Sequence, residues 1–175
     1  ATGATGATGP AGTNGTATYA GPHWSLIDSN TEGSPVAELR AGPYGGPTGQ
    51  DPPAGVGSLG LITADNTEKV AWGNQVDFNG NLVSNLNQVG FSYFVTGEDL
   101  TRYAGNTPNI TLEINPHVAG KTYTSMVYVP PNPTLPPGQG SGWISDDADA
   151  NAGGTSGWWF TNGSVASATG CNQTT

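Results

Sequence analysis

Hydrophobic and polar residues alternate along much of this chain after residue 18. The segment Gln88–Thr96 shows the pattern most clearly, since every second residue is apolar: Val89, Phe91, Tyr93 and Val95. Side chains of an extended strand point alternately to opposite faces, so a period of two indicates a strand with one buried face. This segment therefore predicts a half-buried β-strand.

Similar short apolar segments recur between Gly, Pro and Asn residues, which are typical of turns. They are His23–Asp28, Val36–Ala41, Val56–Thr63, Thr67–Asn74, Asn109–Asn115, Lys121–Val129, Gly142–Asp146 and Gly157–Thr161. Helical periodicity is nearly absent, and the best short candidate for a helical turn is Gly97–Ala104. Many short strands without crossover helices predict an all-β fold, an antiparallel β-sandwich or jelly roll.

The first residues follow a different rule, with glycine at every third position. The glycines are Gly3, Gly6, Gly9, Gly12 and Gly15. Only glycine fits at the crowded axis of the collagen triple helix, so this phase predicts the end of a collagen-like stalk. The alternative is a flexible Gly/Ala/Thr linker. Residues 1–17 form this segment, and residues 18–175 are expected to form the β-sandwich head.

Threonine in these triplets resembles the Gly-Ala-Thr and Gly-Pro-Thr repeats of bacterial collagen-like surface proteins, whose threonines can carry sugars. Gly-X-Y strands associate in threes. A homotrimer is therefore expected, in which the head sets the register of the three chains. Such a head would cap a surface fibre or assemble into one.

Composition narrows the possible partners. The formal net charge is −9, from 13 carboxylates and four Lys and Arg residues. Nucleic acids and anionic membrane surfaces would repel this chain, so no nucleic-acid partner is expected. No apolar run approaches the ~18 residues of a membrane span, so no membrane insertion is expected. Few lysines, many small polar residues and four Asn-x-Ser/Thr sites favour an extracellular or cell-surface location.

The arrangement of the chain from Gly55 onwards resembles a group of secreted bacterial domains with a concanavalin-like or jelly-roll sandwich. The matching stretches are GVGSLGLIT (55–63), EKVAW (68–72), LNQVGFSYF (86–94), ITLEI (110–114) and GWISDDADA…GWWF (142–160). Such domains commonly continue past the Trp pair into a Cys-bearing segment and closing strands. The resemblance therefore implies a head that is truncated at its C-terminus.

One acidic segment has the spacing of a calcium loop. Asp147, Asp149 and Asn151 alternate along SDDADANAGG, and Asp146 would add a further oxygen. Alternate oxygen-bearing side chains in a turn converge on one point, as a calcium ion requires. The alternative is a turn capped by its own Asp and Asn side chains.

Aromatic residues suggest a second kind of site. An exposed indole ring is a good platform for the C–H face of a pyranose, and the candidates are Trp143, Trp158, Trp159 and the ring of Tyr44. The alternative is that these rings pack in the core. A lectin-like, carbohydrate-binding module is therefore the alternative to a structural head.

Catalysis has the weakest support in this sequence. A glycoside hydrolase needs two carboxylates across a cleft, and Glu113 would pair with Glu38, Asp77 or Asp99. No G-x-S-x-G nucleophile elbow is present. The expected function is a non-enzymatic, extracellular structural or adhesive head.

The single cysteine, Cys171, cannot form a disulfide within one chain. A partner would lie beyond Thr175 or in another copy of the chain. The alternative is an inert thiol.

Overall fold

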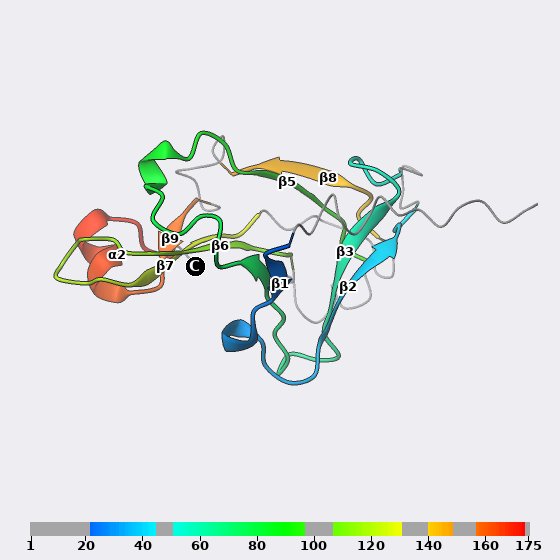
Figure 1. Ribbon diagram of the computed structural model, residues 1–175, viewed down its shortest axis with the longest axis horizontal. Coiled ribbons are helices and arrows are strands. Elements are labelled where there is room, and N and C mark those ends of the chain that lie inside the picture. Colours follow the sequence, from blue (N-terminus) through cyan, green and yellow to red (C-terminus); the bar gives the residue numbers. More distant parts are fainter. Residues whose placement is uncertain (1–21, 45–50, 97–106, 131–139, 149–156, 174–175) are drawn as a thin grey trace, which may run out of the picture. The chain divides into compact units, whose positions relative to one another are not determined.

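The computed structural model describes residues 22–44, 51–96, 107–130, 140–148 and 157–173 (Figure 1). In these residues the fold is mostly β, with antiparallel strand pairs, two 3-10 turns and one short α-helix. The strands are β1 (Trp24–Leu26), β2 (Val36–Ala41), β3 (Gly57–Ile62), β4 (Trp72–Asn74), β5 (Gly90–Tyr93), β6 (Ile110–Ile114), β7 (Thr124–Tyr128), β8 (Ile144–Asp147) and β9 (Trp159–Phe160). Each overlaps a segment that the sequence predicts as a strand, which confirms the mostly β class. The predicted helical turn at 97–104 lies outside the described residues.

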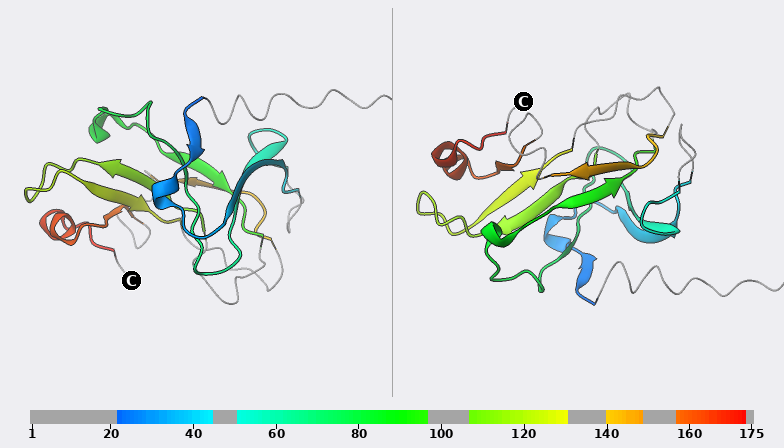
Figure 2. Two further views of the ribbon diagram at one scale, coloured as in Figure 1. Left: turned by 60° about the horizontal axis from the view of Figure 1, so that its bottom comes forward. Right: turned by 90° about the horizontal axis from the view of Figure 1, so that it is seen from above.

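The strands form four small sheets, with the orders β1–β4, β2–β3, β5–β8 and β6–β7–β9 (Figure 2). All pairings are antiparallel. No closed barrel or jelly roll is formed within the described ranges.

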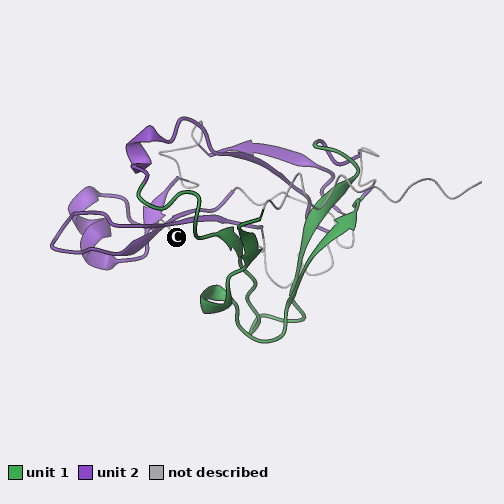
Figure 3. Ribbon diagram, viewed as in Figure 1, with its two compact units in different colours: residues 1–43, 54–80 green, residues 44–53, 81–175 purple. Residues whose placement is uncertain are grey.

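The chain divides into two compact units (Figure 3). Unit 1 comprises residues 1–43 and 54–80, and unit 2 comprises residues 44–53 and 81–175. The predicted boundary between stalk and head, at residue 17, lies outside the described residues. A head spanning 18–175 therefore stays a prediction.

Unit 1 contains the β1–β4 and β2–β3 pairs. The carboxylate of Glu68 connects two of its loops, because it accepts the backbone N–H of Ser34 at 3.0 Å and of Ala64 at 2.7 Å. Gly33 has a φ of +79°, and a Cβ there would lie 2.7 Å from the Glu68 Cγ. Both the backbone angle and the close approach therefore require glycine at this position.

Unit 2 has the better-defined core. Tyr128 in β7 is fully buried and lies edge-on to Phe91 of β5, with ring centroids 6.4 Å apart. Its hydroxyl donates to the Asp146 Oδ2 of β8 at 2.9 Å. Tyr128 of β7 therefore connects the β6–β7–β9 sheet to the β5–β8 pair.

Burial, and secondarily the negative charge of Asp146, raise the pKa of the Tyr93 hydroxyl above its usual value.

Alternation within the strands of unit 2 agrees with the sequence. In β6, Ile110, Leu112 and Ile114 are half-buried, whereas Thr111 and Glu113 are exposed. In β5, Phe91 is half-buried and Tyr93 is buried, whereas Ser92 is exposed. The prediction of one buried face is confirmed for both strands.

The helix α2 (Gly163–Thr169) was not among the predicted elements, because helical periodicity is nearly absent from the sequence. Its N-cap is Asn162, whose Oδ1 accepts the backbone N–H of Ser164 at 3.1 Å and of Val165 at 3.4 Å. The helix ends at Gly170, whose φ of 77° suits glycine. Val165 and Ala166 are the buried residues of this helix. At seven residues the helix is too short for an apolar period to be visible, but its two caps are legible in the sequence.

Candidate ligand-binding site

The tryptophans predicted as sugar platforms contribute to the packing of unit 2. Trp143 lies against Phe94, with ring centroids 5.8 Å apart, and Trp158 lies against Tyr128 at 5.5 Å. Trp159 belongs to β9, opposite Val127 of β7. All three tryptophans are half-buried. The core-packing interpretation is therefore favoured for Trp143 and Trp158.

Tyr44 differs from these tryptophans because 57% of it is exposed. It belongs to unit 2, next to a segment outside the described residues. It stays a candidate platform for a sugar.

The predicted calcium loop is described only in part. Asp146 and Asp147 are adjacent in β8, so their side chains point to opposite faces of the strand. The Asp146 carboxylate already accepts the Tyr128 hydroxyl. Asp149 and Asn151 lie outside the described residues. Within the ranges that the structure describes, no three or more His, Cys, Asp or Glu residues are grouped to hold a metal ion.

The carboxylate predicted for hydrolysis lies on the exposed side of the β6–β7 hairpin. Glu113 accepts a hydrogen bond from Ser125 Oγ at 2.9 Å. Glu38 and Asp77 belong to unit 1, and Asp99 lies outside the described residues. The pairing of Glu113 with any of these carboxylates stays untested.

Two further predictions concern the chain ends. The five phased glycines lie outside the described residues. Cys171 is a half-buried free thiol, and its Sγ lies 3.8 Å from the Thr169 carbonyl oxygen. Its carbonyl accepts the N–H of Phe160 at 3.1 Å, so the backbone of Cys171 supports β9.

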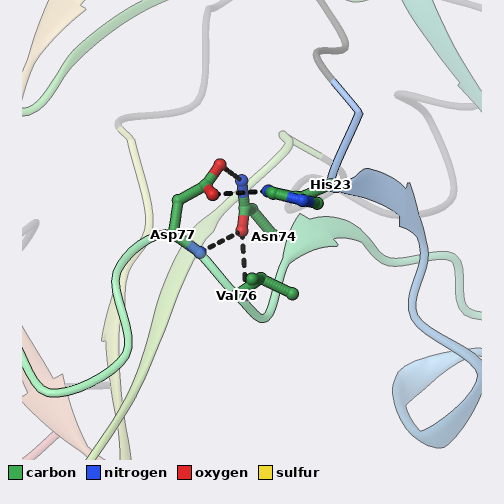
Figure 4. Close-up of polar contacts among 4 residues, drawn as sticks. All are labelled: His23, Asn74, Val76 and Asp77. Atoms are coloured by element: carbon green, nitrogen blue, oxygen red, sulfur yellow. Dashed lines mark hydrogen bonds and ion pairs between the residues drawn. The ribbon is translucent and has the colours of Figure 1, made fainter.

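The structure brings together a polar cluster in unit 1 that the sequence did not reveal (Figure 4). His23 Nδ1 donates to Asp77 Oδ1 at 2.5 Å, and Asn74 Nδ2 donates to Asp77 Oδ2 at 2.6 Å. A carboxylate only accepts hydrogen bonds, so this contact places the imidazole hydrogen on Nδ1. We call His23, Asn74 and Asp77 the HND cluster.

A turn after β4 fixes the HND cluster. Asn74 Oδ1 accepts the backbone N–H groups of Val76 and Asp77, both at 2.9 Å. An asparagine that closes a turn in this way holds its own side chain in one orientation. The β1–β4 register places Trp24 opposite Asn74 and so brings His23 beside the turn. Figure 4 shows the imidazole and the Asn74 amide meeting the same carboxylate.

Two exposed aromatic rings are sequence neighbours of the HND cluster. Trp24 follows His23, and Phe78 follows Asp77. The two rings meet edge to face, with centroids 6.4 Å apart and an interplanar angle of 76°. Trp24 is 38% exposed and Phe78 is 61% exposed. This part of unit 1 therefore presents two exposed rings that are next in sequence to oriented hydrogen-bonding groups.

The contacts of the HND cluster also predict how the Asp77 carboxyl titrates. The Asn74 amide, and then His23, lower the pKa of the Asp77 carboxyl below its ordinary value of 3.8. Because the folded-state pKa is lowered, the contribution of the cluster to stability is present above pH 3.8. It is lost as the pH falls through the lowered pKa.

We expect an NMR titration to give an Asp77 midpoint below 3.8 in the native chain. In the Asn74→Ala variant the midpoint should move back towards that value. The Asp65 carboxyl, whose pKa is lowered mainly by the Thr67 hydroxyl, is an internal control that should not move. An Asp77 midpoint at 3.8 in the native chain would contradict the geometry of the cluster.

Comparison with known proteins gives no relative that would assign this site. No protein-family model matches the chain, and neither curated proteins nor solved structures gave a match. The resemblance to collagen-like surface proteins and secreted sandwich domains therefore rests on the residue pattern. Among the described residues, no helix has the length and apolar character that crossing a bilayer requires.

Proposed function

We propose that this protein is a non-enzymatic, extracellular head that trimerises at the end of a collagen-like stalk and caps or assembles a surface fibre. The observation that carries the proposal is the glycine at every third position from Gly3 to Gly15. Such a segment has no stable fold as a single chain, because a triple helix needs three. The head then supplies the association that the short repeat lacks.

The distribution of apolar surface supports association between copies. Among the residues that the structure describes, thirteen large hydrophobic residues are exposed, and eight of them belong to unit 1. Four of these lie on or beside the β2–β3 pair: Val36, Val56, Leu61 and Ile62. The described part of unit 1 contributes no large hydrophobic residue to the buried core. Exposed apolar surface of this kind is typical of interfaces, and neighbouring copies would cover the four residues of the β2–β3 pair in a trimer.

The fold proposed for the head is an antiparallel sandwich of the jelly-roll kind. The contact of Tyr128 with Phe91, and its hydrogen bond to Asp146, support two sheets that pack face to face in unit 2. The acidic composition supports a soluble extracellular head that nucleic acids do not bind.

Native mass spectrometry of the full chain tests this proposal. We expect the mass of three chains, and we expect removal of residues 1–17 to shift the population towards a single chain. The double variant Gly6→Ala and Gly9→Ala keeps the length of the segment but places methyl groups at the crowded axis. It should lower the melting temperature of the triple helix measured by circular dichroism.

A matched control replaces Ala4 and Ala7, which occupy positions away from the axis, with serine. This variant should retain the oligomeric state. A single-chain mass for the full protein across micromolar concentrations would contradict the proposal.

A further inference from the structure

We propose that the HND cluster, together with Trp24 and Phe78, binds a neutral pyranose of a glycan. The sugar would pack its C–H face on the aromatic pair and place two adjacent hydroxyls against His23 and Asn74. This site is separate from the tryptophans that the sequence favoured. The proposal goes beyond the structural role of the head and does not depend on trimerisation.

The aromatic pair supplies the apolar part of a sugar site. The ring of Phe78 lies edge to face with Trp24, which limits the rotation of both side chains. Both rings keep exposed surface, at 38% for Trp24 and 61% for Phe78. An aromatic ring held by its neighbour presents apolar area at a low cost in conformational entropy.

The HND cluster supplies a matched donor and acceptor. Asp77 occupies Nδ1 of His23, so the Nε2 of the neutral imidazole is left as an acceptor, and it makes no hydrogen bond within the described residues. Asn74 uses its Oδ1 for two backbone N–H groups and one amide hydrogen for Asp77. Its second amide hydrogen remains as a donor. One sugar hydroxyl can therefore donate to His23 while its neighbour accepts from Asn74.

Preorganisation distinguishes this cluster from ordinary surface polar residues. The Asn74 side chain is fixed by three hydrogen bonds, and the His23 ring is oriented by the Asp77 carboxylate. Groups that are already oriented lose little freedom when a ligand binds. The hydroxyl pair would meet groups that need no rearrangement.

The charge of unit 1 selects among glycans. Its described residues hold six carboxylates, Asp28, Glu32, Glu38, Asp65, Glu68 and Asp77, against the two cations Arg40 and Lys69. Sulfated sugars, uronic acids and sialic acids would be repelled by this excess of negative charge. A neutral hexose fits the site better than any anionic ligand.

The test uses the full chain. NMR titration with methyl glycosides of glucose, galactose and mannose should perturb the Trp24 indole N–H and the backbone amides of residues 74–78. A glycan array should give signal on neutral hexoses and none on sulfated or sialylated glycans.

Three variants remove parts of the site: Trp24→Ala, Phe78→Ala and Asp77→Asn. Each variant should raise the dissociation constant for the sugar by about tenfold or more. Asp77→Asn keeps the shape of the side chain but replaces one acceptor oxygen with an amide donor, so the side chain can no longer accept from both His23 and Asn74. Since Phe78 is well exposed, Phe78→Ala keeps the test valid if Trp24→Ala fails to fold.

Two controls match these variants. Tyr123→Ala removes a ring that is 62% exposed in unit 2, and Asp65→Asn neutralises another aspartate of unit 1 that accepts hydrogen bonds. Both should bind the sugar as the native chain does. The proposal is overturned if no neutral glycoside perturbs these signals, or if binding survives in Phe78→Ala and Asp77→Asn. If the full protein has the mass of one chain and still binds the sugar, the fibre proposal is contradicted and the sugar-binding proposal is supported.

Discussion

Replacing Tyr128 with alanine is expected to destabilise the protein by about 3–5 kcal/mol, as for other large aromatic residues removed from a core. Tyr128 is fully buried and is among the largest such side chains of the described residues. Its ring contacts Phe91 and Trp158, and its hydroxyl donates to Asp146. The alanine variant would leave a cavity between these rings and remove the donor for a half-buried carboxylate. Urea unfolding followed by tryptophan fluorescence measures the loss.

Tyr128→Phe separates packing from hydrogen bonding at this position. The ring stays in place while the hydrogen bond to Asp146 is lost, at a cost of about 1–3 kcal/mol. The two variants should therefore differ clearly in unfolding midpoint. An alanine variant as stable as the native chain would show that Tyr128 does not hold the two sheets of unit 2 together.

The second large loss of stability that we expect follows from placing a carboxylate at position 165. Val165 is fully buried in helix α2. An aspartate there would be a buried charge, and an uncompensated buried charge costs about 3–5 kcal/mol. Loss of the cooperative thermal transition of unit 2, or a strongly lowered melting temperature, is the expected result for Val165→Asp.

The neighbouring residue provides the control. Ser164 is exposed in the first turn of the same helix, so Ser164→Asp adds the same charge in water. A negative charge near a helix N-terminus is favourable by about 0.3–1 kcal/mol, so this variant should be as stable as the native chain or slightly more stable. Equal melting temperatures for Val165→Asp and Ser164→Asp would mean that the helix does not bury its apolar face.

Strands were predictable because their signal is local. The segment Val36–Ala41 has the bounds of strand β2 in both the sequence and the structure, and the alternation of Ile110–Ile114 gives the faces of β6. A period of two needs only a few consecutive residues to be visible. Strand partners were not predictable, since the pairing of β5 with β8 joins segments more than fifty residues apart.

The candidate site depends on the same kind of long-range contact. His23 and Asp77 are 54 positions apart, and only the β1–β4 pairing brings them together. The Asn-x-x-Asp spacing after Trp72 was the one local signal, because an asparagine after a strand often closes a turn. Residue type alone suggests Trp143 and Trp158 as sugar platforms, and residue type does not reveal whether a ring lies in the core or on the surface.

The chain crosses between its two units more than once, which has a practical consequence. It passes from unit 1 to unit 2 after residue 43, returns after residue 53 and leaves again after residue 80. Three covalent connections therefore join the units, and a protease that cuts at one of them leaves the halves tethered by the other two. Neither half can be cloned as one uninterrupted fragment. Dissecting this protein into independently expressed pieces will require circular permutation or a grafted loop in place of residues 44–53.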